Sequence, residues 1–269
     1  MSEIADILRR IVDQRRVRID MDLVSEPPSI DSERDEVMDP AVCSSFTEAL
    51  RSAPGMAVIA EVKLGSPRLG SLQDVLDPER QARLYAENGA AAISVVVEPD
   101  FFHGSYELLA RCQRASGLPA LAKDFIVHPI QLEWAQRHGA SAVLLIAALH
   151  PQDELLRLAD RARQLGLVPL VECHSVDDLA RLGAGEWELV GVNNRDLRTF
   201  EVDLERSISM LPRLPVGSLR VAESGIRSAT DVARLSAAGF DAFLIGETLL
   251  LADDPAATLL ELVGGSTAG

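Results

Sequence analysis

One pattern repeats along the chain from Met56 onward and constrains the fold more than any other feature. Each repeat consists of a short apolar run, a polar residue at the end of that run, a loop and an amphipathic stretch. The apolar runs are continuous rather than alternating, as is typical of strands in a parallel sheet that is covered on both faces. Predicted strands cover residues 57–62, 91–97, 119–123, 141–146, 168–172, 189–193, 219–223 and 242–246.

Amphipathic stretches separate these runs, and several of them end in the glycine that a left-handed helix C-cap favours. The predicted helices cover residues 77–88, 129–138, 152–165, 176–182, 204–211 and 229–238. The glycines that follow helices are Gly89, Gly139, Gly166 and Gly239. Eight βα units are the number that closes a barrel, so we predict an α/β protein with a (β/α)8 TIM barrel. An open doubly wound sheet is the alternative, but no strand is followed by a GxGxxG dinucleotide-binding fingerprint.

The first part of the chain precedes the repeats. We predict a single barrel domain over residues 1–269, of which residues 1–55 form an N-terminal helical extension and linker. Apolar residues within 4–19 recur at helical spacing with arginines between them, which indicates an amphipathic helix docked on the main domain. A membrane surface is the alternative. An acidic linker is expected over residues 20–39, and a second short helix over residues 45–52.

Composition excludes several classes of function. The net charge of −15 argues against nucleic acid as a partner, although a local basic cleft can still bind an anionic small molecule. Cys43, Cys112 and Cys173 include no CxxC pair, so neither a disulfide framework nor a zinc site is expected, and a reducing cytoplasm is the simplest location. The N-terminal residues do not resemble a signal peptide, and no apolar run approaches the roughly 20 residues that span a bilayer.

Charged and amide side chains stand at or just after the ends of several predicted strands. In a barrel of parallel strands these ends meet at one mouth, where barrel enzymes have their active sites. Any one of these residues could be a structural ion-pair member. Burial of the whole set for structure alone would cost desolvation without return, so we predict that they are catalytic. The set is Glu61, Lys63, Lys123, Glu172, Asn193 and Glu223.

Loops that contain glycine follow the last two predicted strands. Ser224 and Gly225 follow the seventh strand, and Gly246 and Glu247 follow the eighth. In this architecture such loops are the usual phosphate site, because backbone N–H groups at a short helix N-terminus face the ligand. Ordinary tight turns are the alternative. The position favours a phosphorylated substrate, to which Lys63 can add a point charge.

Three more residues after strand ends are candidates for substrate binding. Arg195 can hold a carboxylate in a bidentate fork, with a salt bridge to a neighbouring carboxylate as the alternative. Phe102 and Phe125 are candidates for a wall against a planar ligand, in a chain with only 4% aromatic residues. His128 and His174 also lie near strand ends, but no histidine pair has metal-ligand spacing, so we expect no metal.

Seven short motifs lie at or near the ends of the predicted strands. They lie at residues 61–67 (Glu-x-Lys-x-x-Ser-Pro), 101–105, 123–126, 170–174, 191–197, 222–226 and 243–247. In register over nearly the whole chain, they resemble the indole-3-glycerol-phosphate synthase family. The resemblance implies closure of the pyrrole ring of 1-(2-carboxyphenylamino)-1-deoxyribulose 5-phosphate, with release of carbon dioxide and water. Ring closure needs an acid and a base but no redox agent, so no cofactor is expected.

The resemblance also implies a role for each catalytic residue. Lys123 would be the general acid at the ketone oxygen, and Glu172 would be the base in the later dehydration. Lys63 would hold the phosphate and act as a second acid, while Glu61 would orient the lysines. Glu223 completes the catalytic set. A buried lysine among other cations is easier to deprotonate, which would suit acid–base work near neutral pH.

The substrate-binding roles follow from the same resemblance. Asn193 and Arg195 would position the anthranilate carboxylate. The residues that flank the ring would be Phe102, Phe125 and Leu197. The remaining contacts would be Ser66 and, around the phosphate, Ser224, Gly225, Gly246 and Glu247.

Several positions depart from the family pattern and keep alternatives open, among them Leu64-Gly65, Arg68, Val97 and Ala122. Leu64 stands where a basic residue is usual, and Arg68 stands where serine is usual. Arg68 is either a solvated loop charge or a substitute for that basic residue. A paralogue that acts on a substituted anthranilate in specialised metabolism is therefore the alternative function.

Two further alternatives belong to other classes. A barrel that only binds a phosphorylated ligand would not need both Lys123 and Glu172. A phosphosugar isomerase would need a strand-end aspartate paired with a cysteine or a second aspartate, which is not evident. We expect a phosphorylated small molecule as the partner, no nucleic acid, no membrane, and a monomer or weak homo-oligomer.

Overall fold

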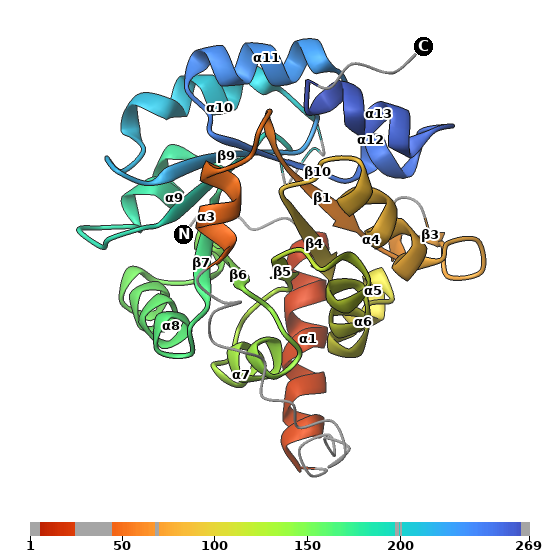
Figure 1. Ribbon diagram of the computed structural model, residues 1–269. Coiled ribbons are helices and arrows are strands. Elements are labelled where there is room, and N and C mark those ends of the chain that lie inside the picture. Colours follow the sequence, from red (N-terminus) through yellow and green to blue (C-terminus); the bar gives the residue numbers. More distant parts are fainter. Residues whose placement is uncertain (1–5, 25–44, 68–69, 197–198, 200, 265–269) are drawn as a thin grey trace.

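The computed structural model describes residues 6–24, 45–67, 70–196, 199 and 201–264. Eight parallel strands close into a barrel in the order β1-β10-β9-β8-β7-β6-β5-β4 (Figure 1). The strands are β1 Ala57–Val62, β4 Ala92–Val96, β5 Ala120–Lys123, β6 Ala142–Ile146, β7 Val168–Cys173, β8 Leu189–Asn193, β9 Leu219–Glu223 and β10 Ala242–Ile245. The predicted barrel is confirmed, and each strand boundary lies within one residue of its prediction.

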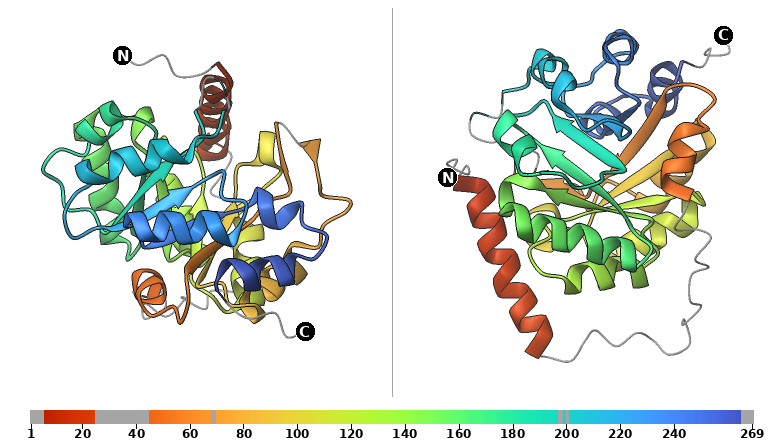
Figure 2. Two further views of the ribbon diagram at one scale, coloured as in Figure 1. Left: turned by 90° about the horizontal axis from the view of Figure 1, so that it is seen from above. Right: turned by 90° about the vertical axis from the view of Figure 1, so that its left-hand side faces the viewer.

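Helices surround the barrel on its outside, as the views from the front and from above show (Figures 1 and 2). They are α4 Pro78–Glu87, α5 Pro99–Phe102, α6 Tyr106–Ser116, α7 Ile130–Arg137, α8 Gln152–Gln164, α9 Val176–Ala180, α10 Leu204–Met210, α11 Ala229–Ala238, α12 Glu247–Leu250 and α13 Pro255–Leu262. Two 3-10 turns, η1 Ala147–Leu149 and η2 Leu211–Arg213, and a small hairpin of β2 Gly65–Ser66 and β3 Gly70–Ser71 complete the described elements.

The four predicted C-cap glycines all have positive φ, between 75° and 119°. Helix α9 ends two residues before its predicted end, and α6 has no counterpart among the predicted helices. None of the helices in the described ranges is long and apolar enough to cross a bilayer.

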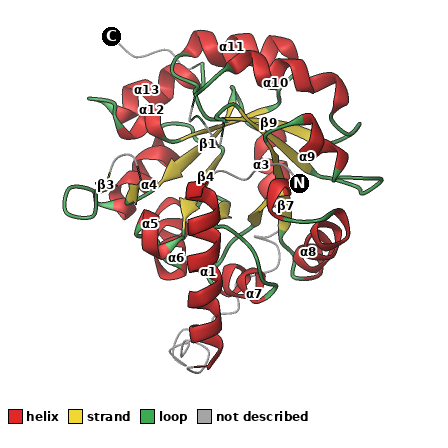
Figure 3. Cartoon of the chain, turned by 180° about the vertical axis from the view of Figure 1, so that it is seen from behind, coloured by secondary structure: helices red, strands yellow, loops and turns green. Residues whose placement is uncertain are grey.

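The N-terminal helix α1 (Asp6–Val24) lies next to α5 and against the chain that follows β4 and β5, where Arg18 pairs with Asp100 and Arg15 with Asp124 (Figures 2 and 3). It buries Leu8, Ile11 and Ile19, so the predicted docking on the main domain is confirmed. The prediction that the linker begins at residue 20 is wrong. Nothing in residues 20–24 opposes a helix, and the helix continues to Val24. The rest of that linker lies outside the described residues.

The short helix α3 (Ser45–Arg51) closes the end of the barrel where the strands begin. Its Phe46 is fully buried and belongs to the same apolar cluster as Ala57, Ala92 and Ala242, the first residues of their strands. This confirms the predicted second helix. Because one end of the barrel is plugged in this way, the opposite end is where a site can open.

The barrel interior decides which side chains reach that opposite end. Successive strand residues point to opposite sides, so every second residue points inward. The inward layer contains Ile59, Leu121, Leu170, Leu189 and Val221. Two or four residues further along the same strands, the inward positions are occupied by Glu61, Lys123, Glu172, Asn193 and Glu223. The apolar interior therefore continues directly into a layer of charged and polar side chains.

Candidate active site

Glu61 lies between the two lysines of the barrel mouth. Nζ of Lys63 donates to one carboxylate oxygen at 2.8 Å, and Nζ of Lys123 donates to the other at 2.9 Å. Glu61 is only 5% exposed, and burial alone would raise its pKa. The charges and hydrogen bonds of Lys123 and Lys63 outweigh burial and lower that pKa to about 2. The carboxylate is therefore permanently charged and fixed at both oxygens.

Lys123 has a pKa above its ordinary value. Burial opposes its charge, but the carboxylates of Glu61, Glu223 and Glu172 more than compensate. The expectation that a neighbouring cation makes this lysine easier to deprotonate is therefore wrong. Lys63 lies on the other oxygen of Glu61, and the charges around Lys123 are predominantly negative. In this site Lys123 is an ammonium ion.

The other side of the mouth holds two carboxylates. Nδ2 of Asn193 donates to Glu172 at 3.1 Å, and Nε2 of His174 lies 3.2 Å from the second oxygen of the same carboxylate. Glu223 is 1% exposed and has Nζ of Lys123 at 3.9 Å. Burial and the adjacent charge of Glu172 raise the pKa of Glu223 well above its usual range.

Glu172, the carboxylate beside Glu223, keeps its negative charge. Burial would raise the pKa of Glu172, but the charges of His174 and Lys123 and the hydrogen bond from Asn193 lower it. Glu223 therefore holds a proton that it can donate to ionised Glu172, as expected of two carboxyl groups that cannot both ionise in one buried site.

Two glycines make room for these buried carboxylates. A Cβ at Gly246 would collide with the carboxylate of Glu61, and a Cβ at Gly191 would collide with that of Glu223. Both glycines occupy inward positions of the barrel, next to the groups that they accommodate. Gly246, predicted as a phosphate contact, thus also has a packing role that the sequence did not indicate.

The predicted phosphate loops lie side by side. Ser224 and Gly225 both have left-handed backbone, with φ of 65° and 75°, and Gly246 is the N-cap of the short helix α12. Thr248 in that helix donates its hydroxyl hydrogen to the carbonyl of Ile226 in the other loop. The loops after β9 and β10 are therefore connected at the mouth.

Arg195 and Glu247, both predicted to bind substrate, contact each other. Nη2 of Arg195 lies 3.3 Å from Oε2 of Glu247. The salt bridge that the sequence left as an alternative is thus formed, although with Glu247. The adjacent Asp196 instead accepts from Arg206 at 3.0 Å.

The two predicted aromatic residues also meet. Phe102 on α5 and Phe125 after β5 have ring centroids 6.0 Å apart. Helix α5 is held by Glu98, which is fully buried and accepts three backbone N–H bonds from the helix, including that of Phe102. Sequence reasoning missed Glu98, although a carboxylate directly before Pro99 is a helix-start signal.

Other predicted residues have less defined positions. Ser66 lies in β2, and Leu64 is buried in the core between strands and helices. Leu197 and Arg68 lie outside the described residues.

Helix α1 contributes a buried arginine that the sequence reading missed. Arg15 is 2% exposed and forms a bidentate pair with Asp124, with Nη2 to Oδ2 at 2.6 Å. Tyr106 and Gln131 donate to the same carboxylate at 2.8 and 2.9 Å. The signal was present, because Arg15 lies four residues from Ile11 on the apolar stripe and so requires a buried partner.

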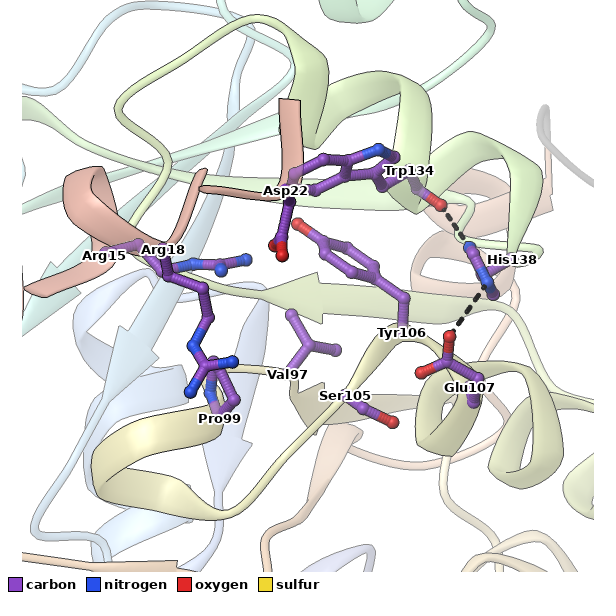
Figure 4. Close-up of a pocket in the computed structure, with 10 residues that line it drawn as sticks. All are labelled: Arg15, Arg18, Asp22, Val97, Pro99, Ser105, Tyr106, Glu107, Trp134 and His138. Carbon is purple, nitrogen blue, oxygen red and sulfur yellow. Dashed lines mark hydrogen bonds and ion pairs between the residues drawn. The ribbon is translucent and has the colours of Figure 1, made fainter. Parts of the chain in front are cut away.

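A cavity of about 360 Å³ lies beside α1 (Figure 4). None of the predicted catalytic residues lines it. Its lining residues are Arg15, Arg18, Asp22, Val97, Pro99, Ser105, Tyr106, Glu107, Trp134 and His138. Among the described residues, no group of three or more His, Cys, Asp or Glu side chains is arranged to hold a metal ion.

Comparison with known proteins adds a family. Residues 8–262 match the sequence model described as indole-3-glycerol phosphate synthase. Relatives of that name include one from Koribacter versatilis, 45% identical over 80% of this chain and 82% of the relative. Another, from Albidiferax ferrireducens, is 39% identical over 96% of this chain and 98% of the relative.

Solved structures with the same fold include 3-hexulose-6-phosphate synthase from Salmonella typhimurium. It has a TM-score of 0.60 and 16% identity, and the match covers 78% of this chain and 97% of that one. Thiamine phosphate pyrophosphorylase from Pyrococcus furiosus has a TM-score of 0.57 and 14% identity, over 81% of this chain and 95% of the other. At this identity the likeness concerns the fold alone.

Proposed function

Because the chain belongs to the indole-3-glycerol phosphate synthase family, we propose that its charged mouth closes the pyrrole ring of 1-(2-carboxyphenylamino)-1-deoxyribulose 5-phosphate. The protein is an enzyme, a carboxy-lyase of tryptophan biosynthesis. The reaction yields indole-3-glycerol phosphate, carbon dioxide and water. The two sides of the mouth suit its two stages.

Ring closure is assigned to Lys123. A ring carbon of the anthranilate attacks the ketone carbon, and the electron pair of the carbonyl bond moves onto the oxygen. The resulting alkoxide is more basic than an amine, so it takes a proton even from a lysine whose pKa is raised. A positioned general acid of this kind contributes roughly 10²–10⁴-fold to the rate.

Dehydration is assigned to the carboxylate side. Loss of carbon dioxide leaves its bonding electrons in the ring, and the new hydroxyl group then leaves as water. Glu172 is ionised and held by Asn193, which supports its role as the base that takes the departing proton. Glu223 holds a proton beside it, which it can give to the departing hydroxyl group. The proton that Glu172 has accepted then passes to Glu223, so both carboxyl groups are restored after each turnover.

Substrate binding is assigned to the rim of the mouth. The contacting rings of Phe102 and Phe125 offer an apolar surface for the anthranilate ring. Arg195 would hold the carboxylate after it releases Glu247, and Lys63 would contact the phosphate. The backbone N–H groups around the phosphate would come from the loops that contain Ser224, Gly225 and Gly246.

One observation carries the proposal: a charged Lys123 lies in the same buried cluster as the Glu172–Glu223 pair. A barrel that only binds a phosphorylated ligand gains nothing from a proton donor and a proton acceptor in one mouth, because both cost desolvation. Acid–base chemistry on the bound molecule, in contrast, requires both groups in the same site.

The test is direct. Purified protein is incubated with 1-(2-carboxyphenylamino)-1-deoxyribulose 5-phosphate, and indole fluorescence is followed with time. We expect turnover without added metal or cofactor, and a substituted anthranilate derivative serves as the comparison substrate. An absence of indole fluorescence from folded protein would contradict the proposal. The comparisons lend no support to the substituted compound as the preferred substrate.

Further statements about the whole protein belong with this proposal. We propose a single domain with residues 1–55 as its extension, located in the cytoplasm and active as a monomer or weak homo-oligomer. Light scattering during size-exclusion chromatography measures the oligomeric state, for which the expected monomer mass is 29.1 kDa.

A further inference from the structure

His174 directly follows β7, two residues after Glu172, and has no role in the mechanism above. Because strand residues two apart share a face, the imidazole and the carboxylate point to the same side. The side chain of His174 is 7% exposed, and its Nε2 lies 3.2 Å from Oε1 of Glu172. Glu172 itself is 3% exposed.

The backbone of His174 is fixed from two helices. Its N–H donates to Oδ2 of buried Asp178 on α9 at 2.9 Å, and its carbonyl accepts from Nη1 of Arg206 on α10 at 3.4 Å. Asp178 and Arg206 are thus the charged groups that contact His174 from outside its own strand. Lys123 and Glu223 face Glu172 from β5 and β9. These contacts fix the backbone position from which the ring extends toward Glu172.

The ring nitrogens have no competing partner. Both are buried, and neither makes a hydrogen bond to any group, Glu172 included, in the part of the chain that the structure describes. A buried polar nitrogen without a partner is costly, so its retention beside a carboxylate requires a reason. The other oxygen of Glu172 already accepts from Asn193, so each carboxylate oxygen has a side-chain nitrogen within 3.2 Å.

We propose that His174 is a positioning residue of the proposed reaction, which orients Glu172 so that it can act as the base. The proposal rests on the function assigned above. A ring nitrogen that carries hydrogen can donate, and Nε2 is the nitrogen that faces Glu172. The charge of His174 also lowers the pKa of Glu172, against the effect of burial.

Two variants separate orientation from charge. His174→Gln retains an N–H donor but cannot become charged, whereas His174→Leu removes both. Loss of a hydrogen bond to a charged group corresponds to roughly a 10- to 150-fold change. We expect His174→Leu to lower kcat by at least tenfold with KM within twofold, and His174→Gln to recover part of that loss. His138→Gln, at the half-buried C-cap of α7 and outside the mouth, is the control and should leave both constants unchanged.

The pH profile of kcat provides the second measurement. Without the charge of His174, burial raises the pKa of Glu172, so the base becomes protonated at a higher pH. The acidic limb of the profile should therefore move to higher pH in His174→Gln. The inference would be overturned if the two pH profiles superimpose and kcat of His174→Leu stays within twofold of wild type. In that case the turnover of the wild type would still support the proposed function. If His174→Leu fails to fold by circular dichroism, His174→Gln alone decides. An inactive wild type instead contradicts the proposed function.

Discussion

Glu61 and Glu223 lie in the same barrel mouth, are both nearly fully buried, and are both within 4 Å of Nζ of Lys123. Their protonation states differ nevertheless. Glu61 has two lysines at 2.8 and 2.9 Å, and its pKa falls to about 2. Glu223 has one lysine at 3.9 Å and the carboxylate of Glu172 beside it, and its pKa rises. Burial is common to both, so the sign of the neighbouring charges and their distances decide whether each carboxyl group is ionised.

The difference divides the mouth into two halves with different uses. On the Glu61 side every charge is fixed, which suits an acid that must remain protonated until an alkoxide forms. On the Glu172 side one proton is shared between two carboxyl groups, which suits a base that must accept and return a proton. Pairs of titratable groups whose environments move their pKa values apart are typical of acid–base sites.

The choice of cation supports this division. Of the 26 basic residues, only Lys63 and Lys123 are lysines, and both contact Glu61. Where a permanent charge is sufficient the chain uses arginine, as in the pair of Arg15 with Asp124. Arginine cannot release its proton in a protein, whereas lysine can. Lysine is thus confined to the place where proton transfer is proposed.

The largest expected effect is at Lys123. Lys123→Ala should lower kcat by roughly 10²–10⁴-fold, the usual range for a general acid, with a smaller change in KM. Lys123→Arg keeps the charge but not the transferable proton, so it should be nearly as slow. Steady-state fluorescence kinetics measure both. An arginine variant with near wild-type kcat would show that charge alone is needed and would remove the acid from this half.

The next effect tests the fixed charges through stability. Glu61→Gln removes the carboxylate nearest to two half-buried lysines, and loss of one partner of a buried pair costs about 3–5 kcal/mol. The melting temperature at pH 7 should fall by roughly 10 °C. Glu87→Gln, exposed on α4, is the control.

The pH dependence of Glu61→Gln has a definite sign. The pKa of Glu61 is depressed from 4.5 to about 2 in the fold, so its stabilisation is complete above pH 4.5 and is lost as pH falls toward 2. The gap between variant and wild type should therefore narrow over that interval in thermal unfolding followed by circular dichroism. A gap that stays constant down to pH 2 would mean that Glu61 is not the compensating charge.

The third prediction concerns the base. Glu172→Gln keeps the shape and can still accept from Asn193, but it cannot take a proton at neutral pH. We expect kcat to fall by at least about a hundredfold, while the melting temperature changes by a few degrees at most. Kinetics and thermal unfolding are measured on the same preparation. If the variant unfolds easily but turns over at the wild-type rate, Glu172 is a structural ion-pair member.

The residues on the two sides of the barrel mouth could be predicted from the sequence, but their protonation states could not. Continuous apolar runs located all eight strands to within one residue, and the two-residue period then placed Glu61, Lys123, Glu172 and Glu223 on the inner face. The proton distribution could not be predicted, because it depends on distances of 2.8 to 3.9 Å between side chains from different strands. The expected easy deprotonation of Lys123 failed for this reason.

Long-range contacts were equally hidden. Arg15 and Asp124 are 109 residues apart in the sequence, and the residues around either one do not indicate that the other is its partner. The position of Arg15 on an apolar stripe indicated a buried partner but not which one. Likewise, the space that Gly191 leaves for Glu223 depends on two adjacent strands in register. Local patterns determine where a side chain points, and the fold determines what it meets.

The smallest predicted effect has the opposite sign to that of Glu61→Gln. Glu223 resists ionisation in the fold, because burial and Glu172 raise its pKa, but it ionises freely near 4.5 when unfolded. The native state therefore loses stability as pH rises above 4.5, by up to about 1.4 kcal/mol per pH unit until Glu223 ionises in the fold. Glu223→Gln cannot ionise in either state, keeps a donor for Glu172, and removes this loss.

Glu223→Gln should consequently melt a few degrees above wild type at pH 8 and equal to it near pH 4.5, which differential scanning calorimetry across this interval measures. The same variant should be slower in turnover, since Glu172 then lacks the neighbour that shares its proton. Opposite shifts in melting temperature for Glu61→Gln and Glu223→Gln at pH 8 require that one carboxyl is charged and the other is not. If both variants are destabilised at pH 8, Glu223 is an ionised partner of Lys123 and the two halves of the mouth do not differ.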